Sequence, residues 1–330
     1  MKRSPEPIYR TAVALGLGLF GFWRLRKIAR GLDNIPDTGG AVLAMTHFGY
    51  LEFALVEWAT WKHNRRRIRF LAKKGAFDKP VVGGLLRGMR HIAVDMNSGG
   101  DAYSDAITAL RAGELIGVFP EAGVSASFTV RDLKTGAARL AAEAGVPVIP
   151  VAVWGGQRLL TKNHKVGFRE RFGVPVTFAF GAPVTVDAAD DPREVTDGLR
   201  DTLQSMVDDL QRTYPAAGDG KWWQPVHLGG TAPTPEQAIA ADEERQRRRD
   251  AEEQRRVLLA EQQLVRDAGV RVRVAAAAPH ANALVAAAPC EAIVEPSAVG
   301  EDGARGADDG ICAGAGDVYA RRVAGEPGTV

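Results

Sequence analysis

Between residues 40 and 184 the chain alternates short apolar runs with stretches of helical character, and this alternation restricts its fold more than any other feature. The apolar runs favour β-strands, and two of the helical stretches end at glycines, Gly113 and Gly145, that suit helix C-caps. Strands that alternate with helices are typical of α/β proteins. The pattern predicts a layered mixed sheet flanked by helices, with strands at "AVLAMTH", "IRFLAK", "HIAVD", "LIGVFPE", "PVIPVAVWG" and "VPVTFAFGAPV".

The first 30 residues form a separate predicted segment. Their apolar run, from Thr11 to Trp23, is shorter than the roughly 20 apolar residues that cross a bilayer. Together with Trp23, the basic cluster beside it predicts a helix lying in the membrane interface; the cluster comprises Arg24, Arg26, Lys27 and Arg30. The alternative is a helix that packs on the core with a solvated end. Because the run lacks an A-x-A-like cleavage site, a secretory signal is not expected.

The main domain is expected over residues 31–231, with a last helix near residues 192–214. Residues 232–274 are charged and Ala-rich, with opposite charges at i,i+4 spacing, which predicts a solvated helical extension. From residue 275 to residue 330 the chain is rich in Ala, Gly and Pro and has few large apolar residues. Such a segment cannot bury a core, so a disordered tail is expected.

Charge and cysteine content exclude several classes of function. The net charge of +2 over 330 residues gives no general attraction for nucleic acid. Both cysteines, Cys290 and Cys312, lie in the Gly/Ala-rich tail, which predicts no disulfide framework and fits a reducing compartment. The six histidines are scattered without metal-ligand spacing, so neither a metal site nor a cofactor is expected.

Reactive side chains gather at two predicted junctions between a strand and a loop, where sites form in α/β folds. His47 follows the first strand with Glu52 five positions later, and Glu121 follows another strand. Lys134 and Gly136 open a helix, where free N–H groups and the helix dipole favour a phosphate. This set suits acyl transfer to the hydroxyl of a phosphorylated acceptor. The histidine would take the hydroxyl proton, and the acid would fix its tautomer.

Four motifs occur in order between Gly31 and Pro183, namely "THFGYLE", "GMRHIAVDM", "FPEAGVS" and "GVPVIPVAV". Their order and spacing resemble the glycerophospholipid acyltransferase family, of the 1-acyl-sn-glycerol-3-phosphate (lysophosphatidic acid) acyltransferase type. That family shows N-H-x4-D, G-x-x-x-x-x-R, F-P-E-G-T-R-S and a V-P-V-I-P-V-type strand. The later pattern "LKTGAARLA" and "VWGGQRLLTK" looks most like an actinobacterial branch.

The resemblance implies a role for each matching residue. His47 would be the general base, and Glu52 stands where the family has aspartate. Residues expected to bind substrate are Glu121, toward the acceptor glycerol, Lys134 and Gly136, toward its phosphate, Lys73 and Arg90. The strand that the family associates with the acyl-chain channel corresponds to Pro147, Ile149 and Pro150.

This chain departs from the family motifs at several positions. Met96 and Val124 stand where the family has arginines, and Ala122 replaces the motif glycine. The two lost arginines weaken the case for a simple glycerol-phosphate acceptor. Nearby residues that are candidates to replace them are Arg87, Arg90, His91 and Arg131.

The expected function is therefore transfer of a fatty acyl group from acyl-CoA, or else from an acyl carrier protein, to the hydroxyl of lysophosphatidic acid. His47 would act as base in a direct attack, because no convincing nucleophile is present. The same chemistry on another lipid acceptor and a non-catalytic, membrane-associated lipid-binding protein are the alternatives. The expected location is peripheral, on the cytoplasmic face of the plasma membrane.

Overall fold

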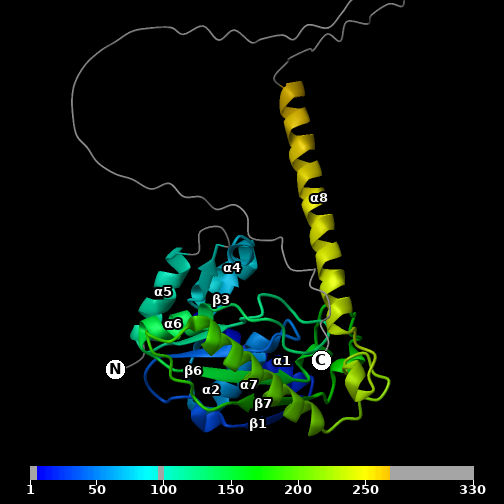
Figure 1. Ribbon diagram of the computed structural model, residues 1–330. Coiled ribbons are helices and arrows are strands. Elements are labelled where there is room, and N and C mark those ends of the chain that lie inside the picture. The colour runs from blue at the N-terminus through cyan, green and yellow to red at the C-terminus, as the bar shows by residue number, and fades with distance from the viewer. Residues whose placement is uncertain (1–5, 96–99, 268–330) are drawn as a thin grey trace, which may run out of the picture. The chain divides into compact units, whose positions relative to one another are not determined.

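The structure is a computed structural model, and it describes residues 6–95 and 100–267. Seven strands form one sheet in the order β1-β7-β6-β2-β5-β3-β4 (Figure 1). Neighbouring strands run parallel except β6 and β7, which are antiparallel, so the predicted mixed sheet is confirmed. The strands are β1 (Arg26–Arg30), β2 (Ala41–Met45), β3 (Ile68–Lys73), β4 (Ile92–Val94), β5 (Leu115–Val118), β6 (Val148–Trp154) and β7 (Pro175–Phe180).

Helices cover both faces of this sheet. The α-helices of the described residues are α1 (Pro7–Phe22), α2 (Glu52–Asn64), α3 (Lys74–Phe77), α4 (Pro80–Gly88), α5 (Gly100–Arg111), α6 (Gly136–Ala144), α7 (Pro192–Arg212) and α8 (Pro235–Asp267), of which α8 projects away from the sheet in Figure 1. Val42 and Ala44 of β2 face a core cluster built with α5, α6 and α7, and α7 crosses β6 and β7 in Figure 1. Leu43 and Met45 face the opposite cluster, built with α1 and α2. Because successive strand residues point to opposite faces, a strand covered on both faces is apolar throughout.

Local signals explain where several helices begin and end. Gly145 ends α6 in the left-handed conformation, with a φ of 66°, as expected of a C-cap glycine. Asp191 caps the N-terminus of α7, since its side chain accepts a hydrogen bond from the N–H of Arg193 at 2.8 Å. Pro192 then occupies the first helical position, where its missing N–H costs nothing. Predicted and observed elements therefore agree closely from residue 41 to residue 212.

The N-terminal segment differs from the predicted interface helix over residues 1–30. Helix α1 ends at Phe22, and Arg26–Arg30 form an edge strand paired with β7. Tyr9 and Phe20 are buried, and the Glu6 carboxylate pairs with the guanidinium groups of Arg67 and Arg69. The segment is thus part of the domain and not a detachable anchor. Its outer face still exposes large apolar side chains, which are Ile8, Leu15, Leu19 and Phe22.

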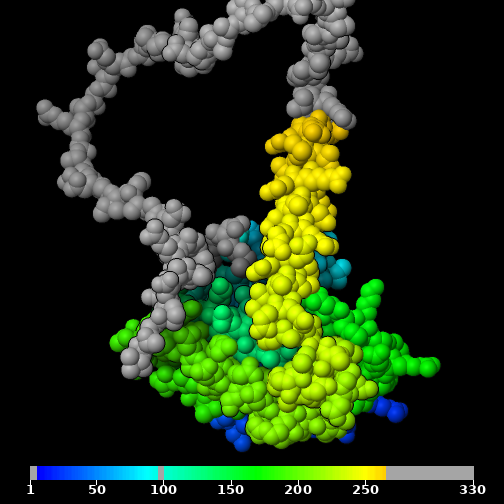
Figure 2. Space-filling model, turned by 45° about the vertical axis from the view of Figure 1, so that its right-hand side comes forward, coloured from blue at the N-terminus to red at the C-terminus, as the bar shows by residue number. Residues whose placement is uncertain are grey.

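No helix within the described ranges is both long and apolar enough to cross a bilayer. The predicted charged helix is confirmed as α8, although it is not wholly solvated. Ala238 in its first turns is buried, and Figure 2 shows these turns packed against the body of the protein. Met96 and the predicted tail over residues 275–330, with Cys290 and Cys312, lie outside the described residues.

Candidate active site

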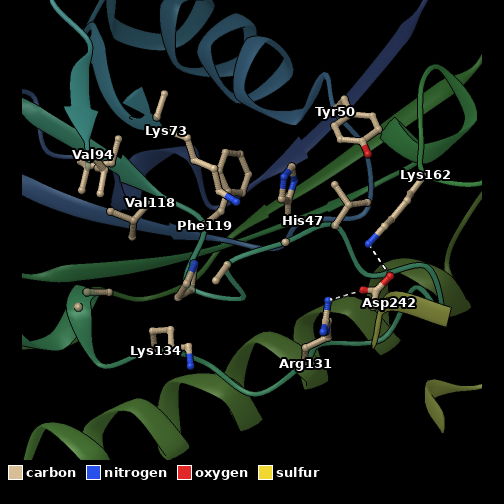
Figure 3. Close-up of a pocket in the computed structure, with 18 of the residues that line it drawn as sticks. His47, Tyr50, Lys73, Val94, Val118, Phe119, Arg131, Lys134, Lys162 and Asp242 are labelled. Carbon is tan, nitrogen blue, oxygen red and sulfur yellow. Dashed lines mark hydrogen bonds and ion pairs between the residues drawn. The ribbon is translucent and has the colours of Figure 1, made fainter. Parts of the chain in front are cut away.

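A cavity of about 940 Å³ opens at the carboxyl ends of the parallel strands. His47 follows β2, Lys73 ends β3, Val94 ends β4 and Phe119 follows β5, and all four line the cavity (Figure 3). The edge of the sheet formed by carboxyl ends is where α/β folds hold their ligands. This is the junction at which the sequence predicted reactive side chains.

The predicted contact between His47 and Glu52 is formed. His47 Nδ1 lies 3.2 Å from Glu52 Oε2, and Glu52 is fully buried at the first position of α2. Both carboxylate oxygens also accept hydrogen bonds from the N–H of Phe48, at 3.0 and 2.9 Å. The short loop between β2 and α2 is therefore hydrogen-bonded to the first residue of α2. These bonds fix the Glu52 carboxylate beside the His47 ring.

The environment of this pair determines what the imidazole can do. Burial raises the pKa of Glu52, and the hydrogen bond and charge of His47 oppose that rise. A carboxylate at Nδ1 selects the tautomer with the proton on that nitrogen and leaves Nε2 as the proton acceptor. The His47 ring stacks on Phe119, with ring centroids 4.1 Å apart, which fixes its plane at the cavity wall. The arrangement suits a general base.

Glu121 is placed differently from the role that the resemblance implies. Its Oε1 accepts a hydrogen bond from the N–H of His47 at 2.8 Å, and its Oε2 accepts one from the N–H of Arg131 at 3.1 Å. The residue is only 5% exposed, and burial raises its pKa to about 8. In this structure the carboxyl group therefore holds two loops together, and its role toward the acceptor stays a prediction. The N–H of Ser125 also joins these loops by donating to the carbonyl of His47 at 2.8 Å.

Lys73, Lys134 and Gly136 all line the cavity, as the prediction requires. Lys134 is held through its backbone N–H, which donates to the carbonyl of Pro120 at 2.9 Å. Ala122, which replaces the family glycine, adopts a φ of 57°, a conformation that glycine accepts more readily than alanine. Val124, at the position of a family arginine, is buried in the cavity wall.

Other predicted residues lie away from the cavity. Arg90 Nη1 lies 3.6 Å from Glu6 at the α1 side of the domain, and its side chain is largely exposed. Within the described part of the chain, the cavity lining includes none of Pro147, Ile149 and Pro150. Ile149 is buried in the middle of the sheet, and the expected acyl channel along this strand stays a prediction.

Of the candidates to replace the lost arginines, the structure brings one to the cavity. Arg131 lines it. Arg87 instead donates to the carbonyl of Phe77 at 2.9 Å. His91 accepts a hydrogen bond from the N–H of Phe70 through Nδ1, at 3.1 Å, and burial lowers its pKa to about 4.

Sequence reasoning missed the part of the cavity wall that α8 supplies. Asp242 Oδ1 lies 2.6 Å from Lys162 Nζ, and its Oδ2 lies 3.1 Å from Arg131 Nη1 (Figure 3). Arg245 also pairs with Asp242, one turn along the helix, and Arg249 lines the cavity beyond it. Because Arg131 and Lys162 lie far from Asp242 in sequence, the charge pattern of α8 gave no sign of these two contacts.

The described residues contain no group of three or more His, Cys, Asp or Glu side chains placed to hold a metal ion. The reactive groups that the structure places at the cavity are His47 with Glu52 and the surrounding cationic side chains.

Comparisons with known proteins agree with this geometry. Residues 27–154 match the family model described as Acyltransferase. The chain is 31% identical to an uncharacterized protein of Mycobacterium leprae over 246 residues, covering 61% of this chain and 65% of that protein. It is also 31% identical to the 1-acyl-sn-glycerol-3-phosphate acyltransferase of Bacillus subtilis over 135 residues, covering 40% of this chain and 65% of that enzyme. The chain thus spans about 65% of the length of these curated relatives.

Among solved structures, the 1-acyl-sn-glycerophosphate acyltransferase PlsC of Thermotoga maritima shares the fold. The TM-score is 0.53 at 21% sequence identity, and the match covers 63% of this chain and 81% of that one. At this sequence identity the likeness shows a shared fold and nothing about the reaction.

Proposed function

Because this chain belongs to the glycerophospholipid acyltransferase family, we propose that it transfers a fatty acyl group from a thioester to the hydroxyl of a lysophospholipid. The observation that carries the proposal is the pair of His47 and the buried Glu52 at the cavity wall. A histidine oriented by a carboxylate is a general base suited to activating a hydroxyl group. The retained pair favours an enzyme over a lipid-binding protein without activity.

In the proposed reaction His47 Nε2 takes the proton of the acceptor hydroxyl as its oxygen attacks the thioester carbonyl carbon. A carbon–oxygen bond forms, the carbon–sulfur bond breaks, and the departing thiolate takes the proton back from the imidazolium. The products are an ester and a free thiol, and the base is regenerated. Glu52 stabilises the imidazolium without being protonated itself. The stacking of Phe119 on the ring and the hydrogen bond of Glu121 to the main chain of His47 support this role.

The proposed substrates are acyl-CoA, or an acyl carrier protein, as donor and lysophosphatidic acid as acceptor. A phosphate-bearing acceptor is supported by Lys134 and Lys73 in the cavity wall. Another lipid acceptor remains the second candidate, and the observation that favours it is Val124, buried in the wall where the family has an arginine. Phosphatidic acid would be the product with the first acceptor.

We also propose a peripheral position at the cytoplasmic face of the plasma membrane. Leu15, Leu19 and Phe22 are exposed on α1, although Tyr9 and Phe20 bind the same helix to the core. Phe22 adjoins two further exposed rings, Phe168 and Phe172, with centroids 6.3 and 5.3 Å away. This set of exposed apolar residues is called the apolar edge below; it comprises Leu15, Leu19, Phe22, Phe168 and Phe172. Aromatic and aliphatic side chains gathered in this way suit the interface of a bilayer.

The test is an assay of the purified protein with acyl-CoA and a panel of lysophospholipid and neutral lipid acceptors. We expect release of thiol that depends on a lysophospholipid acceptor, together with an ester product identified by mass spectrometry. The protein's own Cys290 and Cys312 set the background of the thiol assay. Acceptor-independent thiol release, or no ester with any acceptor, would contradict acyl transfer.

A further inference from the structure

The cavity holds more positive charge than its own carboxylates can neutralise. Among the described residues that line it, six are cationic and two are acidic, whereas the whole chain carries a net charge of only +2. The six are Lys73, Arg131, Lys134, Lys162, Arg245 and Arg249, and the two are Asp242 and Glu243. A cleft lined by one sign of charge focuses the field and attracts ligands of the opposite sign. The excess indicates an anionic ligand.

Helix α8 contributes part of this charge, although its residues lie well beyond the matched acyltransferase segment. Asp242, Arg245 and Arg249 recur at three- and four-residue intervals, so they share one face of the helix. That face is held to the domain by the ion pairs of Asp242 with Arg131 and Lys162. A hydrogen bond at 3.0 Å from Arg245 to the side chain of Asn163 adds a further contact.

Arg245 and Arg249, the two arginines of α8 that line the cavity, differ in the contacts that they already make. Arg245 pairs with Asp242 and Asn163, so its role is to position the helix. Arg249 lies one turn further along the same face, is exposed and lines the cavity. Its planar guanidinium can bind two oxygens of a phosphate at once, which a lysine cannot do. Arg249 is therefore the residue of α8 best suited to an incoming anion.

We propose that residues 235–249 of α8 are part of the substrate site, and that Arg249 binds a phosphate group carried by one of the two substrates. The inference rests on the proposed function for the identity of those substrates. Both carry phosphate esters: acyl-CoA in its nucleotide, and lysophosphatidic acid in its headgroup. Asp242 holds α8 in this position, because its ion pairs join the helix to the loops that follow β5 and β6.

The experiment measures binding without turnover, by isothermal titration calorimetry on the full-length protein. The ligands are CoA and pantetheine for the donor, and a short-chain lysophosphatidate and the matching monoacylglycerol for the acceptor. Within each pair the second compound lacks phosphate. The variant is Arg249→Gln, and the control is Arg247→Gln, which lies about 200° around the helix and pairs with Glu244 at 3.1 Å.

We expect Arg249→Gln to weaken binding of one phosphate-bearing ligand about tenfold, as loss of a charge-assisted hydrogen bond does. Binding of the phosphate-free analogue and of every ligand to Arg247→Gln should match the wild type. A loss confined to CoA assigns Arg249 to the donor, and a loss confined to lysophosphatidate assigns it to the acceptor; both support the proposal.

Unchanged affinity of Arg249→Gln for both phosphate-bearing ligands would overturn the proposal that Arg249 binds phosphate. An equal loss in Arg247→Gln would do the same, and so would a wild type that prefers neither phosphate-bearing ligand to its analogue. The proposed function fails separately: protein that binds phosphate through Arg249 and makes no ester with any acceptor refutes acyl transfer and leaves the anion site standing.

Discussion

The carboxyl group of Glu121 accepts a hydrogen bond from the backbone N–H of His47, at 2.8 Å, although 74 residues separate them. The loop after β5 therefore fixes the main chain at the base of the reactive imidazole, while Glu52 fixes its ring. Position and orientation of His47 are thus controlled by two different acids.

Replacing His47 with alanine should lower the rate of acyl transfer by about 10²–10⁴-fold, the usual cost of losing a general base. Because the backbone contacts of His47 with Glu121 and Ser125 do not involve its ring, the fold should be retained. Steady-state kinetics and circular dichroism of the variant test both statements. Unchanged turnover in the folded variant would remove His47 from the mechanism.

Replacing Glu52 with glutamine should lower kcat on the order of 10²–10⁴-fold and leave KM nearly unchanged. The amide can still accept a hydrogen bond from the N–H of Phe48, but it can also donate toward Nδ1 and select the wrong tautomer. Glu52→Asp should also lose activity, because removing about 1.5 Å of reach takes the acid beyond a contact that is already 3.2 Å. A fully active glutamine variant would show that His47 works without this acid.

The free energy of unfolding should fall as the pH rises from about 5 to about 9, and Glu57 should account for part of the fall. Burial raises the pKa of Glu57 from 4.5 to about 8. Between these values the folded protein keeps a proton on Glu57 that the unfolded chain has released, so the contribution of Glu57 to stability is fully present below pH 4.5 and is lost as the pH rises through 8.

Glu57→Gln should reduce the slope of stability against pH in urea titrations. It should not abolish the slope, because burial also raises the pKa of Glu121 to about 8. The matched control is Glu253→Gln, at an exposed position of α8, which should keep the wild-type slope. Equal slopes in wild type and Glu57→Gln would contradict the assignment.

Asp242→Asn should release the first turns of α8 from the domain. An amide cannot pair with the three cations that now surround this carboxylate, which are Arg131, Lys162 and Arg245. Hydrogen exchange over residues 235–249 should become on the order of fivefold faster, which corresponds to about 1 kcal/mol. Asp250→Asn, on the same helix, is the control.

The Asp242→Asn variant also separates the effect of cavity charge on phosphate binding from the effect of the position of α8. Asp242→Asn makes the cavity more positive, so charge alone would tighten phosphate binding. Loss of the helix position would instead weaken it, and this is the result that we expect from titrations with the phosphate-bearing ligands. Faster exchange without any change in phosphate affinity would mean that α8 packs on the domain without serving the site.

Membrane binding should depend on the apolar edge. Deleting residues 1–30 is not a clean test, because it also removes β1 and the partner of Arg67 and Arg69. Replacing Phe168 or Phe172 with serine should weaken binding to anionic vesicles by about tenfold, the cost of one lost aromatic contact. Sedimentation with vesicles measures this, with the exposed Val226→Ser as control. Equal pelleting of all variants would refute the proposed edge.

Periodicity predicted most of the fold because β2 and β6 are apolar throughout and α6, just before β6, ends at Gly145. It missed β1, since "RKIAR" is basic and alternates between exposed and half-buried residues at the sheet edge. The contact of His47 with Glu52 was predictable because five residues separate them. The burial of Glu121 and the contacts of Asp242 depend on chain segments brought together only by the fold.

The pairing of β1 with β7 also sets an order of assembly. Arg26 lies opposite Pro175, so β1 has no partner strand until about 145 further residues, up to β7, have been synthesised. Helix α1 is tied much earlier, because Glu6 and Tyr9 contact residues 67–69. Distant strand pairing is slow to form, since a long loop must close before any contact offsets its entropy. The early contacts of α1 shorten that search, and the pairing of β1 with β7 is left as a late step, followed by the packing of α7 and α8.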